Sequence, residues 1–221
     1  NSQNSSEVFA KIAVKHENPK GVGVFLKDAT GLGLSSPPGL SGFAGARPKP
    51  SPILSLFSFL YKKENVGFTL QFDDAPSEPI EIAHGISVPS SFANINVSEP
   101  NISNLYKGVQ LIEASLEEIA WGRSGDKGNK ANIGIIARHP NLLPYIWDTF
   151  SEEKIVEIFS HFLENDNIDR HYLPGISGVN FVLHDVLGGG GTTSLRNDPQ
   201  GKGYAQVLLS CKIKVPKNLL V

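Results

Sequence analysis

Glycine, proline and serine are concentrated in residues 29–52, and a stretch of this composition is not expected to form the interior of a helix or of a sheet. We expect a long ordered loop or a binding loop there, with only short regular segments on either side. Val8–Val14 and Gly21–Leu26 have the spacing of paired strands. Ile53–Leu60 and Gly67–Phe72 are predicted to form a hairpin around a charged turn. One further strand is predicted at Pro79–Ala83.

A second change of composition divides the chain. Residues 85–108 carry little charge and show no apolar period, so we interpret them as a linker. The sequence therefore predicts a β-rich segment in residues 1–108 and a separate domain in residues 109–221.

The second half has the pattern of a small α+β domain. Ser151 is suited to cap a helix, because apolar residues follow it at helical spacing. Val179–Leu187 is expected to form a second, short helix that ends at Gly188. Strands are predicted at Leu111–Trp121, Ala131–Arg138, Asp169–Leu173 and Gln206–Val215. Two helices on one face of such a sheet predict a ferredoxin-like α/β sandwich, preceded by a small and mostly β segment.

Charge and cysteine content narrow the function. The net charge is −2, from 20 Lys and Arg against 22 Asp and Glu, so a broad nucleic-acid interface is not expected. The apolar runs are too short to span a membrane, so no membrane partner is expected either. The single cysteine, Cys211, excludes an internal disulfide and a CxxC metal site, and favours a cytoplasmic location. The chain begins at Asn1 and contains no Met, so we expect it to be the C-terminal part of a longer protein.

The first candidate site is the glycine-rich segment Gly122–Asn132. Three glycines permit a tight loop whose backbone N–H groups point at a ligand. The functional interpretation is an anion or carboxylate site, and the alternative is a hairpin whose Asp and Asn cap its own backbone. The polar side chains that carry the functional interpretation are Arg123, Ser124, Asp126, Lys127, Asn129 and Asn132.

The second candidate is Gly188–Lys202, which opens with four glycines. Hydroxyl groups and an arginine with a bidentate fork again suit anion recognition. The alternative is a flexible loop followed by a turn. The residues predicted to bind a ligand are Gly189, Gly190, Ser194, Arg196, Asp198 and Lys202.

These residues resemble a known family. The segments RSGDKGN, NFVL, LGGGG and SLRNDPQGK are similar to the C-terminal domain of the acyclic terpene utilisation (AtuA-like) family over about residues 110–216. Residues 8–85 are similar to the end of that family's larger N-terminal domain. The resemblance implies a ferredoxin-like fold and a role in the breakdown of acyclic terpenes such as citronellol and geraniol. It also adds Asn180 to the motif positions, but it supplies no catalytic mechanism.

Two functional hypotheses follow. In the first, the chain is part of an enzyme, and both glycine-rich segments converge on an acidic small molecule or an acyl-CoA thioester. Arg123 and Arg196 hold its carboxylate or phosphate, while Lys127 and Asp126 form a close pair that transfers a proton. In the second, the domain is a non-catalytic structural or oligomerisation module that packs on a second copy or on the N-terminal domain. The sequence identifies no cofactor.

Overall fold

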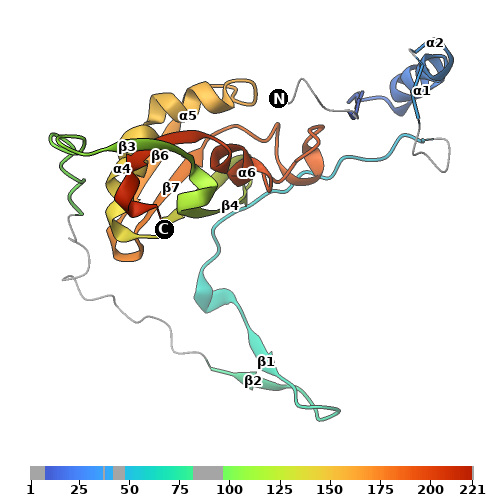
Figure 1. Cartoon of the computed structure of the whole chain (residues 1–221). Helices are drawn as coiled ribbons and strands as arrows, with labels where there is room; N and C mark the ends of the chain where they lie inside the picture. The colour runs from blue at the N-terminus through green and yellow to red at the C-terminus, as the bar shows by residue number, and fades with distance from the viewer. Residues whose placement is uncertain (1–7, 37, 42–47, 82–96, 221) are drawn as a thin grey trace. The chain divides into compact units, whose positions relative to one another are not determined.

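The computed structural model describes residues 8–36, 38–41, 48–81 and 97–220 (Figure 1). The chain divides into two compact units, which are described separately. One comprises Asn1–Ser55 with Asn101–Val221, and the other comprises Leu56–Pro100. The predicted family domains of residues 1–108 and 109–221 stay a prediction, as does the linker, of which residues 85–96 lie outside the described residues.

The first described element is a helix where the sequence predicted a strand. Helix α1 spans Pro19–Ala29. The four-residue α2 spans Leu32–Ser35 and so lies inside residues 29–52, where a loop was expected. The side chain of Asn18 accepts a hydrogen bond from the backbone N–H of Lys20, and Pro19 occupies the first turn. The strand predicted at Gly21–Leu26 is therefore wrong, and residues 8–14 form neither helix nor strand.

The unit Leu56–Pro100 contains a two-stranded hairpin. Strand β1 (Phe68–Leu70) pairs antiparallel with β2 (Glu78–Ile80), and a 3-10 turn at Lys63–Asn65 precedes β1. The predicted pairing of Ile53–Leu60 with Gly67–Phe72 is wrong, because Phe68–Leu70 uses the downstream strand instead. Residues 51–81 are exposed throughout.

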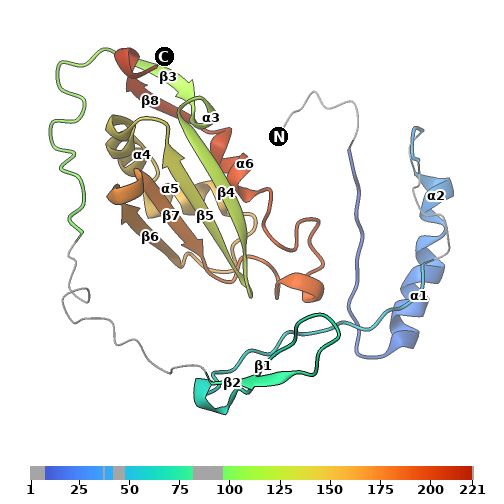
Figure 2. The same cartoon turned by 90° about the horizontal axis from the view of Figure 1, so that it is seen from below.

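A four-stranded antiparallel sheet forms the centre of the other unit (Figure 2). Its strand order is β4-β5-β7-β6. The strands span Ala120–Lys127 (β4), Lys130–Ala137 (β5), Ile168–Leu173 (β6) and Gly178–Leu183 (β7). The predictions for Ala131–Arg138 and Asp169–Leu173 are confirmed. The helix predicted at Val179–Leu187 is wrong, because every second residue of β7 enters the core.

A short ribbon of β3 (Leu111–Ser115) and β8 (Lys212–Pro216) lies beside this sheet. Both strands are shorter than predicted. The helical turn α3 (Leu116–Ile119) begins directly after β3, where Ser115 and Glu118 form a capping box. Helix α6 (Tyr204–Leu209) occupies the first part of the strand predicted at Gln206–Val215.

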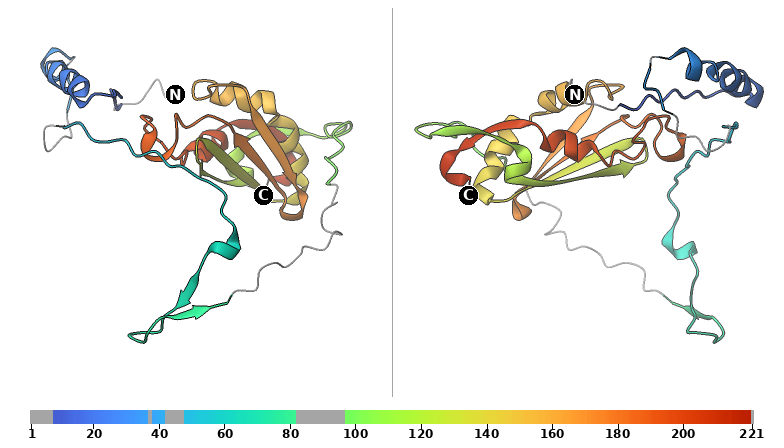
Figure 3. Two further views of the ribbon diagram at one scale, coloured as in Figure 1. Left: turned by 180° about the vertical axis from the view of Figure 1, so that it is seen from behind. Right: turned by 45° about the vertical axis from the view of Figure 1, so that its right-hand side comes forward.

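Helices cover one face of the sheet (Figures 2 and 3). Helix α4 spans Leu143–Thr149 and α5 spans Glu152–Phe159. Ser151 caps α5 as predicted, since its Oγ accepts from the N–H of Lys154. The remaining 3-10 turns are Pro140–Leu142, Pro174–Ile176, Gly191–Thr193 and Lys217–Leu219.

The core lies between the helices and this face of the sheet. It includes Ile133, Phe150, Phe159 and Phe181, all of which are inaccessible to solvent. The α+β sandwich is confirmed, and the opposite face of the sheet is not covered by a described helix. Among the described residues, none of the helices has the length and apolar character needed to cross a membrane.

Candidate functional site

The first glycine-rich segment is a β-hairpin rather than an open loop. Lys127 and Lys130 are paired, so only Gly128 and Asn129 lie in the turn. Gly128 has φ +66°, which a glycine adopts without steric cost at the first central position of a tight hairpin turn. Arg123 to Lys127 consequently belong to β4, and their side chains alternate between the two faces of the sheet.

The second glycine-rich segment packs directly on this turn. The side-chain oxygen of Asn129 accepts a hydrogen bond of 2.7 Å from the N–H of Gly189. The carbonyl oxygen of Asn129 accepts from the N–H groups of Val186 and Leu187. A Cβ at Gly190 would stand 2.1 Å from the carbonyl oxygen of Gly128. The two segments therefore meet, and their contact is made of backbone groups and Asn129.

Two of the predicted ligand-binding residues, Ser124 and Asp198, form hydrogen bonds with the backbone at the start of helix α6. Ser124 is buried; its Oγ accepts from the N–H of Ala205 (2.9 Å) and donates to the carbonyl of Lys202 (3.1 Å). The carboxylate of Asp198 accepts from the N–H groups of Lys202 (3.0 Å) and Gly203 (2.7 Å). The side chains of Ser124 and Asp198 thus already accept hydrogen bonds from the backbone N–H groups that an external anion would need.

The expected Lys127–Asp126 pair is not formed. Adjacent residues of a strand point to opposite faces, and the Nζ of Lys127 donates to the backbone carbonyl of Asp126. The carboxylate of Asp126 instead lies 3.7 Å from the Nζ of Lys202.

The two arginines do not converge, which corrects the expectation of a shared arginine site. The guanidinium of Arg196 donates to the carbonyl oxygen of Phe162 (2.7 Å) and lies over that ring. Phe162 stacks on the buried Tyr204, so Arg196 is on the helix side of the sheet. Ser194 Oγ accepts from the N–H of Arg196 and holds the local turn. Arg123 is exposed on the other face.

The uncovered face of the sheet brings three predicted residues together. Strand pairing places Arg123 opposite Gly134, Gly134 opposite Asn180, and Asn180 opposite His171. These four residues form one row across all four strands. One step along the sheet, Asn132 donates to Asn180 Oδ1 at 3.3 Å. The side-chain oxygen of Asn180 thus accepts a hydrogen bond within the sheet. Its amide nitrogen is the atom that can donate to a ligand.

A hollow of about 470 Å³ lies over this row. Its volume is within the range of small-molecule sites. Gly134 forms part of its floor, and the polar groups of Arg123, Asn180 and His171 lie at one part of the wall. The apolar side chains along the rest of the wall are those of Trp121, Ile136, Leu173 and Ile176.

The electrostatics of the hollow favour an anion. Arg123 has no ion-pair partner among the described residues, and the described lining contains no carboxylate. The nearest acid on this face of β6 is Asp169, which is bound to His184 at 2.7 Å. The hydrogen bond from His184 lowers the pKa of Asp169, so this carboxylate is ionised and already paired at neutral pH. In the described part of the chain, no cluster of His, Cys, Asp and Glu is suited to hold a metal ion.

Comparison with known families agrees with this architecture. Residues 114–214 match the family model described as AtuA ferredoxin-like domain. This part of the chain is an AtuA ferredoxin-like domain. Comparisons with curated proteins and with solved structures gave no match.

Sequence reasoning did not identify two residues of the hollow. His171 and Trp121 of the AtuA ferredoxin-like domain lie on the uncovered face beside Asn180 and Arg123. The period-2 alternation of β6 and β4 was the available signal, because it places residues 169, 171 and 173, and residues 121 and 123, on one face. Strand pairing was also needed, and a single sequence does not reveal it.

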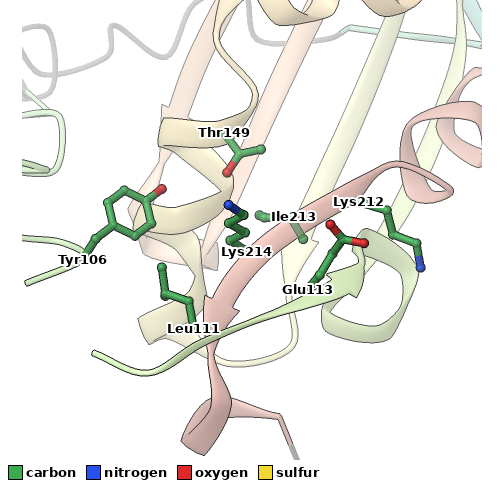
Figure 4. A pocket seen from close by; sticks show the side chains of 7 residues that line it. All are labelled: Tyr106, Leu111, Glu113, Thr149, Lys212, Ile213 and Lys214. Atoms are coloured by element: carbon green, nitrogen blue, oxygen red, sulfur yellow. The ribbon is translucent and has the colours of Figure 1, made fainter. Parts of the chain in front are cut away.

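A second hollow, of about 410 Å³, lies beside the β3–β8 ribbon (Figure 4). Glu113 and Lys214 occupy facing positions of the ribbon, so both signs of charge are present. The hydroxyl of Tyr106 donates to Asp148 at 2.5 Å. Burial, together with this hydrogen bond, raises the pKa of Tyr106 to about 12, and the phenol stays protonated at neutral pH. This hollow has no clear preference for an anion.

Proposed function

We propose that the AtuA ferredoxin-like domain binds an acidic small molecule on the uncovered face of its sheet, as part of an enzyme acting on that acid or on its acyl thioester. One observation carries this proposal: Arg123, which has no ion-pair partner in the described part of the chain, lies in a cross-strand row with Asn180 and His171, beside an apolar wall. A guanidinium, an amide N–H and an imidazole together suit a carboxylate. The apolar wall suits an aliphatic body.

The contacts of the two glycine-rich segments support a structural role for those segments. Ser124, Asn129 and Asp198 form hydrogen bonds with backbone groups of the chain itself. The proposed ligand site therefore keeps Arg123, Asn132 and Asn180 from the sequence prediction and moves away from Lys127 and Asp126. Acyclic terpene breakdown and a cytoplasmic location remain predictions.

Trp121 provides the readout for a binding test. The chain contains two tryptophans. Trp121 is 55% exposed beside the hollow, whereas Trp147 is 4% exposed in the core. A fluorescence titration with hexanoate, hexanol and hexanoyl-CoA should show saturable quenching by hexanoate and a weaker effect of hexanol. Trp121→Phe should abolish the signal.

Two variants separate the hollow from the glycine-rich segments. Arg123→Gln should weaken hexanoate binding at least tenfold, since it removes the charged hydrogen bond to the carboxylate. Lys127→Gln is the matched control: it removes an exposed cation from the same strand and should change affinity less than twofold. Gly134→Val should block binding without unfolding, because its Cβ has no neighbour closer than 3.8 Å. Equal effects of Arg123→Gln and Lys127→Gln would contradict the proposal.

A further inference from the structure

The stretch before the β1–β2 hairpin exposes an unusual amount of apolar surface. Six of the nine side chains in residues 53–61 are large, apolar and more than half exposed: Leu54, Leu56, Phe57, Phe59, Leu60 and Tyr61. The exposed fraction is 84% for Leu56, 83% for Phe57 and 71% for Phe59. Exposed apolar surface of this kind marks a surface that contacts another molecule.

The backbone of residues 56–61 is also unpaired. These residues form neither helix nor strand (Figure 1). Among the described residues, no hydrogen bond engages their N–H or C=O groups. The rings of Phe57 and Phe59 are 6.2 Å apart, and those of Phe59 and Tyr61 are 6.3 Å apart. Aromatic side chains at positions i, i+2 and i+4 that approach one another in this way indicate an extended backbone.

The sequence of this stretch is symmetric about its centre. Residues 56–60 read Leu-Phe-Ser-Phe-Leu, which is the same in both directions. In an antiparallel pair of two identical strands centred on Ser58, each Leu56 lies opposite a Leu60 and each Phe57 opposite a Phe59. The two Ser58 residues face each other at the axis. Apolar cross-strand pairs of this kind stabilise antiparallel sheets.

We propose that residues 56–60 pair antiparallel with the same residues of a second copy of the chain, about a two-fold axis at Ser58. A two-fold interface requires a surface that is complementary to itself, and a palindromic strand meets this requirement. Phe57 and Phe59 together expose roughly 200–400 Å² per chain, which is the upper limit of what they can bury. With the leucines, the apolar surface available is a large part of the about 800 Å² per partner in a stable interface.

The flanking charges agree with this register. Lys62 and Lys63 follow the palindrome and fall opposite residues 53 and 54 of the second copy, so no cations meet. The same lysines, and Pro52 at the other end, discourage addition of further strands. These flanking residues therefore favour a dimer over continued strand addition. This pairing does not depend on the proposed ligand site.

Sedimentation velocity of the 221-residue chain over a range of concentrations tests the proposal. The wild type should form a dimer. Ser58→Asp places two carboxylates face to face and should weaken dimerisation at least tenfold. Ser55→Asp is the matched control, because residue 55 lies opposite Tyr61, and it should change dimerisation less than threefold. A monomeric wild type, open-ended aggregates, or a dimer insensitive to Ser58→Asp would overturn the proposal.

Disulfide trapping gives an independent readout. Facing residues of an antiparallel pair have Cα atoms about 4.5–5.5 Å apart, which a disulfide can span. Mild oxidation of Ser58→Cys should give a covalent dimer whose disulfide maps to residue 58 and not to Cys211. Ser55→Cys should give little covalent dimer under the same oxidation. Equal yields from the two variants would show that residues 56–60 do not pair in this register.

Discussion

Removal of the Ser124 hydroxyl should destabilise the AtuA ferredoxin-like domain without affecting ligand binding. Ser124 is 5% exposed, and its Oγ bridges strand β4 to the first turn of α6. In Ser124→Ala, the N–H of the fully buried Ala205 loses its partner. An orphaned buried donor costs about 1–3 kcal/mol, and loss of a helix cap costs a similar amount, so we expect a loss of about 2 kcal/mol.

Urea unfolding followed by circular dichroism measures this loss. The midpoint should fall with an unchanged slope, and the melting temperature should drop by roughly 8 °C. Ser210→Ala is the matched control, since its exposed hydroxyl donates only to the carbonyl of Val207 in the same helix. It should cost less than about 0.5 kcal/mol. If both variants lose the same stability, Ser124 does not cap α6. If Ser124→Ala loses hexanoate affinity, the hydroxyl belongs to the ligand site.

Two further perturbations test the local geometry. Gly190→Ala adds a Cβ that would meet the Gly128 carbonyl oxygen at 2.1 Å, so it should lower the free energy of unfolding by roughly 3 kcal/mol or more. Gly191→Ala is the control: its Cβ meets no atom within 4 Å, and it should cost about 1 kcal/mol in the same urea assay. Equal losses of stability would refute the packing of the two glycine-rich segments. The hydrogen bond from His184 lowers the pKa of Asp169 in the folded state. The ionised Asp169 therefore stabilises the fold above the pKa of the unfolded carboxyl, and this stabilisation is lost as the pH falls through the folded pKa. NMR titration of the Asp169 carboxyl carbon should therefore show a higher pKa in His184→Ala than in the wild type or in His161→Ala, and an unchanged pKa would exclude the pair.

The elements that the sequence predicted correctly have strong local signals. Strand β5 ends in an apolar run at residues 133–137, and helix α5 follows a serine cap with apolar residues at helical spacing. The errors at α1 and α3 also had local signals. An Asn-Pro start precedes α1, and a Ser-x-x-Glu capping box opens α3. The apolar alternation of both segments favoured strands, although their capping residues indicated helices.

Other features could not be predicted from local sequence. Helix α6 begins where Ser124, 81 residues before Ala205, supplies its hydroxyl, so the helix start depends on a tertiary contact. The candidate site shows the same limit. Arg123 and Asn180 were identified from their motifs, but His171 joins them only through the pairing of β6 with β7. The shared arginine site failed because a sheet separates Arg123 from Arg196.

NMR mapping of hexanoate binding locates the ligand site on the sheet. We expect the largest amide shifts at Arg123, Gly134, His171 and Asn180, and we expect Arg123→Gln to remove them at the same hexanoate concentration. Shifts centred on Gly128, Asn129 and Gly188–Gly190, with the sheet row unchanged, would contradict this assignment and return the ligand site to the glycine-rich segments.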